Sequence, residues 1–263
     1  MKSASLTASS TPTPSWQRWI TVGYGAAVYL TSVAALLYTI AFSLDLWVPR
    51  TVSTGPARPV GQAVLGNLAL LMLFGLQHSV MARPAFKRAL GRWVPGPAER
   101  PTYCLATCIC LGLLFALWSP IEGTVWITSA PWLVITLRTI AGCGFVLLLT
   151  ASFQLNHFEL FGLQQPWRAL HGRPQAATSF QTPRLYRLVR HPIYLGMLMI
   201  IWAAPHLTVG HLLFSSVCTA YILVGSTLEE IDLVASLGAP YRNYQRRVSR
   251  LIPLRAILGS RRS

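Results

Sequence analysis

Long uncharged apolar stretches constrain this chain more than any other feature. A membrane-spanning helix needs about 20 apolar residues, and most of the stretches approach or exceed that length. They occupy residues 23–44, 60–80, 103–118, 132–153, 193–204 and 211–228. The fifth is short, so it is either a tilted span that extends back through Leu185 or a helix that does not cross fully. We therefore predict an all-α fold, a polytopic transmembrane helical bundle of five to six membrane segments.

The chain is basic, with 22 Lys and Arg residues against seven acids. It is also 53% hydrophobic and only 11% charged, whereas soluble domains carry about 25% charged residues. A soluble nucleic-acid-binding protein would not contain such long apolar stretches. We therefore expect the lipid bilayer, and not a nucleic acid, as the partner of this chain.

Basic residues gather in alternate connections between the apolar stretches. They are Arg83, Lys87, Arg88, Arg92 and Arg100, then Arg168, Arg173, Arg184, Arg187 and Arg190, and finally Arg242, Arg246, Arg247, Arg250, Arg255, Arg261 and Arg262. The other set of loops offers only Arg50 and Arg58. Loops rich in Lys and Arg stay in the cytoplasm, so six crossings place both termini there.

The two ends of the chain differ from its apolar body. Residues 1–18 begin with a stretch rich in Ser, Thr and Pro, which predicts a disordered cytoplasmic tail. Residues 19–254 form one integral-membrane domain, and 255–263 form a basic C-terminal tail. All five cysteines fall in apolar segments, without a His or Cys pair at ordinary metal-ligand spacing. We predict no disulfide and no metal.

A basic motif, Arg190-His191-Pro192-Ile193-Tyr194-Leu195-Gly196, is followed about 35 residues later by Glu229-Glu230. A helix that begins at Pro192 points its free N–H groups and positive dipole end toward Arg190 and His191, which suits a carboxylate. The two glutamates can accept from an ammonium or from ribose hydroxyls. S-adenosyl-L-methionine carries both an amino acid end and a nucleoside end. Because adjacent helical residues point about 100° apart, at most two of Glu229, Glu230 and Asp232 can address one ligand.

The motif around Pro192, with Glu229-Glu230-x-x-Leu233 and Gly238-x-x-Tyr241-x-x-Tyr244, resembles the C-terminal signature of integral-membrane methyltransferases. The isoprenylcysteine carboxyl methyltransferase group is the best-known example. Two earlier motifs, at 77–87 and 156–163, resemble those of the methanethiol S-methyltransferase branch, which is similar to the NnrU proteins. Glu159 stands where that branch carries Asp, and Gln164-Gln165 lacks the basic residue that usually follows.

The resemblance implies a cytoplasmic pocket for S-adenosyl-L-methionine, formed by the last two helices and the C-terminal segment. Together with the chemistry above, it gives these candidate cofactor-binding residues: Arg190, His191, Pro192, Tyr194, Leu195, Gly196, Glu229, Glu230, Tyr241, Tyr244 and Arg247.

The implied activity is methylation of the sulfur of methanethiol to dimethyl sulfide in a bacterial inner (cytoplasmic) membrane. The thiol proton needs an acceptor, because a thiolate is the better nucleophile. Candidates are His78, helped by Asn156, His157 or Asp232. Two alternatives stay open: a methyltransferase for a lipid or prenylcysteine-type acceptor, and a non-enzymatic NnrU-like transport or assembly protein. The gathering of polar groups at one side favours an enzyme, and the oligomeric state stays open.

Overall fold

The computed structural model describes residues 15–174 and 181–253, so most of the predicted N-terminal tail and the predicted tail 255–263 lie outside the described residues. Residues 15–18, which we expected in the N-terminal tail, already belong to the first helix. The elements are α1 Ser15–Ser43, α2 Val60–Ala82, α3 Pro84–Leu90, α4 Gly96–Leu117, β1 Thr124–Ile127, α5 Pro131–Leu155, α6 His157–Leu160, α7 Gln164–Leu170, the 3-10 turn η1 Arg184–Arg187, α8 Pro192–Trp202, β2 His206–Thr208, α9 Val209–Leu237 and α10 Ala239–Arg247.

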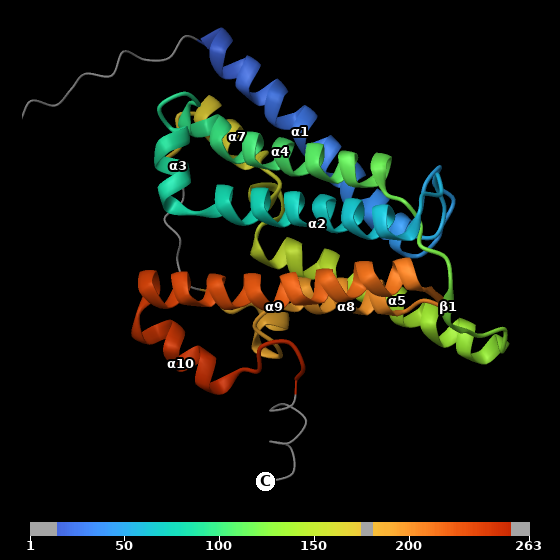
Figure 1. The fold of residues 1–263 in the computed structure, drawn as a ribbon. Coiled ribbons are helices and arrows are strands. Elements are labelled where there is room, and N and C mark those ends of the chain that lie inside the picture. Colours follow the sequence, from blue (N-terminus) through green and yellow to red (C-terminus); the bar gives the residue numbers. More distant parts are fainter. Residues whose placement is uncertain (1–14, 175–180, 254–263) are drawn as a thin grey trace, which may run out of the picture.

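The predicted helical membrane bundle is confirmed. Five helices, α1, α2, α4, α5 and α9, are long and apolar enough to cross a membrane. They lie side by side in Figure 1, with α10 folded back against the end of α9. Arg138 is the one charged residue of the apolar helix α5. Its guanidinium donates to the carbonyl of Leu44, just after the end of α1.

The fifth apolar stretch does not form a full-length helix. The 11 residues of α8 rise about 16 Å, roughly half of the 30 Å hydrocarbon core of a bilayer. Before it the chain forms the short turn η1 beside α5, where the Leu185 amide donates to the Gln154 side chain at 3.0 Å. The fifth segment is therefore broken and runs from η1 through an extended stretch into α8.

The extended stretch before α8 has its own backbone partners. Val189 and Ser249 form a parallel bridge, and the amides of Arg190 and His191 donate to the carbonyls of Ser249 and Arg250 at 2.9 and 3.1 Å. Irregular backbone inside a membrane protein must be buried and satisfied in this way. The C-terminal segment thus fixes the stretch that carries the basic motif.

Two glycines let α5 and α8 approach closely. A Cβ atom built on Gly196 would lie 2.5 Å from the carbonyl oxygen of Gly144. A Cβ atom on Gly144 would lie 2.7 Å from the carbonyl oxygen of Gly196. Small residues at helix contacts are typical of membrane bundles, where van der Waals packing drives association. Gly196 therefore lies at the contact between α8 and α5, where a side chain would not fit.

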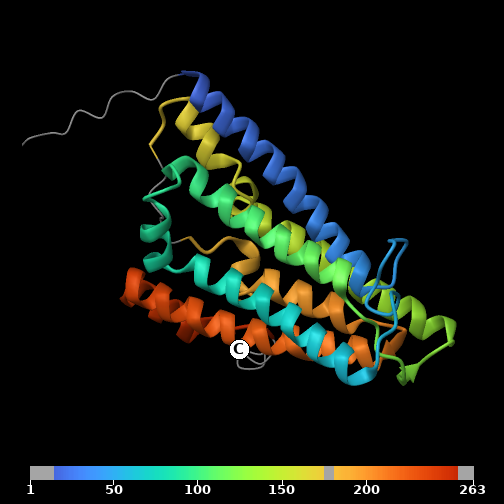
Figure 2. The same ribbon diagram turned by 45° about the horizontal axis from the view of Figure 1, so that its top comes forward.

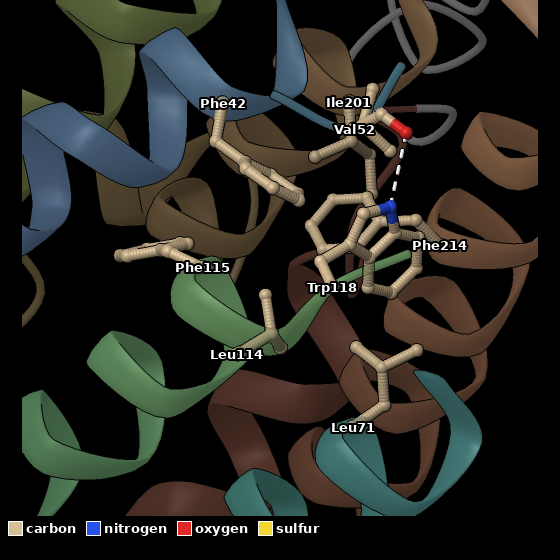
Figure 3. Close-up of a cluster of buried hydrophobic side chains, with 8 residues drawn as sticks. All are labelled: Phe42, Val52, Leu71, Leu114, Phe115, Trp118, Ile201 and Phe214. Carbon is tan, nitrogen blue, oxygen red and sulfur yellow. Dashed lines mark hydrogen bonds between the residues drawn. The ribbon is translucent and has the colours of Figure 1, made fainter. Parts of the chain in front are cut away.

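The end of the bundle away from the basic loops is closed by a small sheet and an aromatic core. Between α8 and α9, β2 pairs antiparallel with β1, with Trp126 opposite Leu207. Next to it, Trp118 is buried and donates from its indole N–H to the Val52 carbonyl at 3.0 Å (Figure 3). The other side chains of this cluster are Phe42, Leu71, Leu114, Phe115, Ile201 and Phe214.

Among the described residues, the basic connections after α2 and α5 and the basic helix α10 lie at the opposite end, which we call the loop end. Here α2 leads into α3, α5 into α6 and α7, and α9 into α10, as both views show (Figures 1 and 2). Asp232 near the end of α9 pairs with Arg83 after α2. The alternation of basic and non-basic loops predicted from the sequence therefore corresponds to two physical ends of the bundle.

Candidate functional site

A cavity of about 360 Å³ opens inside the bundle and is walled by α1, α2, α4, α8 and α9. It runs from the loop end, at Arg100 and Glu229, to the middle of the bundle, at Leu111 and Met197. Five of the predicted site residues line it: His78, Arg190, His191, Tyr194 and Glu229. The remaining predicted residues surround this cavity or lie apart from it.

Arg190 and Glu230 form a largely buried ion pair at the cavity wall. The guanidinium donates to both carboxylate oxygens, at 2.7 and 3.1 Å, and also to the carbonyls of Gln245 and Val248. Glu230 accepts further from His191 Nε2 and from the Gln245 amide, each at 3.0 Å. The side chains are only 11% and 12% exposed. Both charges are therefore engaged by the protein itself.

Glu229 faces the cavity instead. Its carboxylate accepts from the Tyr194 hydroxyl at 3.0 Å, and His191 Nδ1 lies 3.8 Å from it. The rings of His191 and Tyr194 stack with centroids 5.3 Å apart. The prediction that adjacent acids point in different directions is confirmed, because Glu229, Glu230 and Asp232 address the cavity, Arg190 and Arg83 respectively.

His78 lies across the cavity, near the end of α2. Its ring stacks on Phe74 with centroids 5.4 Å apart, and the Tyr103 hydroxyl lies 2.8 Å from Nε2. The Arg100 guanidinium lies over the Tyr103 ring, 5.0 Å from its centroid. The sequence reasoning missed Tyr103 and Arg100. Their separation of three residues places both on one face of α4, but nothing in the sequence links that face to His78.

Asn156 lies between α5 and α6, and His157 is the first residue of α6. Asn156 has a left-handed conformation (φ 97°), and its side chain caps α6 by accepting from the Glu159 amide at 3.3 Å. The buried His157 bonds Ser152 Oγ at 2.9 Å and the Tyr29 hydroxyl at 3.1 Å. Burial lowers the pKa of the His157 imidazole, which favours its neutral form. Neither residue lines the cavity.

The predicted residues of α8 and α10 have mainly packing positions. Pro192 and Gly196 are buried on α8, while Leu195 also belongs to its first turns. On α10, Tyr241 is buried and Arg247 is exposed. The Tyr244 hydroxyl donates to the Tyr186 carbonyl, and burial raises its pKa to about 12, with Glu230 adding to the rise and Arg190 opposing it.

Arg250 is a further residue that the sequence reasoning did not single out. Its guanidinium donates to the Leu223 carbonyl and to Ser226 Oγ, both at 2.6 Å, and also to Thr227 Oγ1. It thereby ties the C-terminal segment to α9 beside the stretch that carries Arg190 and His191. Within residues 15–174 and 181–253, no three His, Cys, Asp or Glu side chains gather as metal ligands.

Known proteins are similar to this chain over most of its length. Residues 67–251 match the family model described as NnrU protein. Methanethiol S-methyltransferase 1 of Bradyrhizobium diazoefficiens is 47% identical, over 90% of this chain and 84% of its own. Methanethiol S-methyltransferase of Mycobacterium tuberculosis is also 47% identical, over 90% and 97%. Nurim of Xenopus laevis is 31% identical, over 80% and 77%. No solved structure matches the chain.

Proposed function

Since the chain belongs to the NnrU family, we propose that it is a membrane-bound methyltransferase that converts methanethiol to dimethyl sulfide with S-adenosyl-L-methionine as the methyl donor. One observation carries this proposal: relatives named methanethiol S-methyltransferase are 47% identical over at least 84% of their own length. The similarity spans the motifs at 77–87 and 156–163 as well as the C-terminal signature.

The cavity has the chemistry that this donor needs. The Glu229 carboxylate accepts one hydrogen bond from the described residues, from Tyr194. Since a carboxylate has about four acceptor positions, room is left for an ammonium or for ribose hydroxyls. The rest of the wall is mainly apolar, and the volume of about 360 Å³ falls within the usual range for ligand sites. When bound, S-adenosyl-L-methionine supplies an electrophilic methyl group on a sulfonium sulfur.

We assign His78 as the base that accepts the proton of the thiol. Its imidazole lines the cavity, and the Tyr103 hydroxyl lies 2.8 Å from Nε2 and 3.0 Å from Nδ1. A small thiol offers little to recognise, so selectivity rests on the apolar walls. Those walls also keep water from the reacting sulfur.

Three other predicted catalytic residues are given supporting roles. His157 joins the turn after α5 to α1 through Tyr29, Asn156 caps α6, and Asp232 joins α9 to Arg83 after α2. Glu230 holds Arg190 and His191 in place, so it shapes the wall that Glu229 completes. In this proposal they position the site without touching the thiol.

The loop end is assigned to the cytoplasm of a bacterial inner membrane, because it carries the three basic connections. α1 begins at this end, packed against α7, and α9 leads into α10 there (Figure 1). The donor is a charged cytoplasmic metabolite, so a cavity that opens at this end suits it.

Headspace gas chromatography tests the function. Purified protein in detergent receives S-adenosyl-L-methionine and methanethiol, and dimethyl sulfide is measured with each reagent left out in turn. We expect product only with both. Calorimetric binding of S-adenosylhomocysteine without dimethyl sulfide would keep a methyltransferase but replace methanethiol by a larger acceptor. Folded protein that gives neither signal would contradict the proposal and favour a transport or assembly role.

A further inference from the structure

A second cavity, which we call the polar cavity, lies at the loop end between the start of α4 and the turn after α5. Its volume is about 330 Å³. The polar side chains that line it are Lys87, Glu99, Arg100, Asn156, Glu159 and Gln165. The end of the motif at 77–87 and the motif at 156–163 therefore meet here. The methyl transfer described above gives neither Lys87 nor Glu159 a role.

The polar cavity adjoins the first cavity directly. Arg100, Leu155 and Leu160 line both of them. Arg100 Nε donates to the Leu160 carbonyl at 3.0 Å, which holds the guanidinium at the shared wall. A single layer of side chains thus separates the polar cavity from the space assigned to methyl transfer.

The charges around the polar cavity balance. Lys87 and Arg100 are cationic, Glu99 and Glu159 are anionic, and their formal charges sum to zero. Lys87 Nζ lies 3.7 Å from Glu99 Oε1, and the two side chains are 39% and 34% exposed. Such an exposed pair is weak, so both groups remain available to a ligand. Separated charges of both signs complement a dipolar ion.

Glu159 is the acceptor at the inner wall of this cavity. Asn156 Nδ2 donates to Glu159 Oε2 at 3.1 Å, which orients that carboxylate at the same wall.

We propose that the polar cavity binds an α-amino acid group. Lys87 and Arg100 pair with its carboxylate, while Glu159 accepts from its ammonium. In the first cavity, by contrast, Arg190 already donates to Glu230, Gln245 and Val248, so it is not available to such a carboxylate. The group has two possible sources: the amino acid end of the methyl donor, which rests on the proposed function, or a separate free amino acid.

Calorimetry on the full chain in detergent distinguishes the sources. S-adenosylhomocysteine carries the amino acid group, and 5′-methylthioadenosine is the matched nucleoside thioether without it. If the donor's own end binds here, Lys87→Met and Glu159→Gln should each reduce S-adenosylhomocysteine affinity about tenfold and leave 5′-methylthioadenosine affinity unchanged. Arg88→Met is the matched control, because Arg88 is an exposed neighbour on α3 that lines neither cavity.

Free methionine tests the second source. Binding of methionine to the wild type that is lost in Lys87→Met, with an unchanged S-adenosylhomocysteine affinity, would assign the polar cavity to a separate amino acid. If Lys87→Met and Glu159→Gln alter neither binding, the proposal is overturned, and dimethyl sulfide formation by the same variants would leave the proposed function intact. A wild type that binds neither S-adenosylhomocysteine nor methionine overturns both.

Discussion

His78 is the residue on which the proposed chemistry depends most directly, because it lines the cavity and bonds Tyr103. Removing a general base typically lowers turnover by 10²–10⁴-fold. We expect His78→Ala to lower kcat by at least about 10²-fold while S-adenosylhomocysteine affinity is preserved. Dimethyl sulfide formation and calorimetry measure the two effects. His206→Ala is the control, because His206 bonds Thr124 at the other end of the bundle; unchanged turnover in His78→Ala would remove it as the base.

The adjacent glutamates should respond differently to the same substitution. Glu230→Gln leaves the buried Arg190 without its counter-charge, and breaking a buried ion pair costs about 3–5 kcal/mol of folding free energy. Glu229→Gln removes a half-exposed carboxylate that faces the cavity, so it should weaken S-adenosylhomocysteine binding with little loss of stability. Thermal unfolding in detergent and calorimetry separate the two. Equal loss of stability in both variants would contradict this division.

The sequence predicted that these two glutamates point in different directions, but it could not tell which one faces the ligand. That choice depends on Gln245 and Val248, which approach Arg190 only because α10 folds back. Tyr103 was missed for a related reason. An aromatic residue at a membrane segment end is typical of an interfacial anchor, and only the three-dimensional arrangement places it against His78.

Among the elements, the contact between α5 and α8 depends most on the absence of side chains. Gly144→Ala introduces a methyl group 2.7 Å from a backbone oxygen of α8, and overpacking typically costs about 1–3 kcal/mol. Gly142→Ala is the matched control on the same helix, because no atom lies within 4 Å of its Cβ position. We expect thermal unfolding to shift down for Gly144→Ala only. Equal melting temperatures would mean that the helices separate without cost.

Hydropathy located the long helices. The helices α2 and α5 extend the predicted stretches by one or two residues, whereas α4 begins seven residues before its predicted stretch. The broken fifth segment was not readable. Its extended part is stabilised by hydrogen bonds to residues 249 and 250, about 60 positions away in sequence, and local patterns carry no signal for such a partner. The short β1–β2 pairing was missed for the same reason.

At the scale of the whole molecule, charge asymmetry orients the bundle. Arg88 lies at the loop end and Arg58 precedes α2 at the other end. If the loop end is cytoplasmic, a membrane-impermeant maleimide should label Arg58→Cys in intact spheroplasts and Arg88→Cys only after permeabilisation. The wild type is the control for the five native cysteines. The reverse labelling pattern would invert the topology and move the cavity mouth to the outer face.

The depth of the cavity sets the size of the acceptor. Its inner part reaches Ala35, Leu36 and Met197, where an alkyl group longer than methyl can extend along apolar walls. We expect the wild type to methylate propanethiol as well, and Ala35→Leu to lower kcat/KM for propanethiol about 10-fold or more relative to methanethiol, since one misplaced methylene is worth about 10–200-fold. Ala34→Leu is the matched control, because Ala34 is exposed on α1 and does not line the cavity. Both thiols are assayed by headspace gas chromatography. An equal effect of Ala35→Leu on the two thiols would place the acceptor nearer the loop end, beside Glu229, and leave the inner part of the cavity to another portion of the donor.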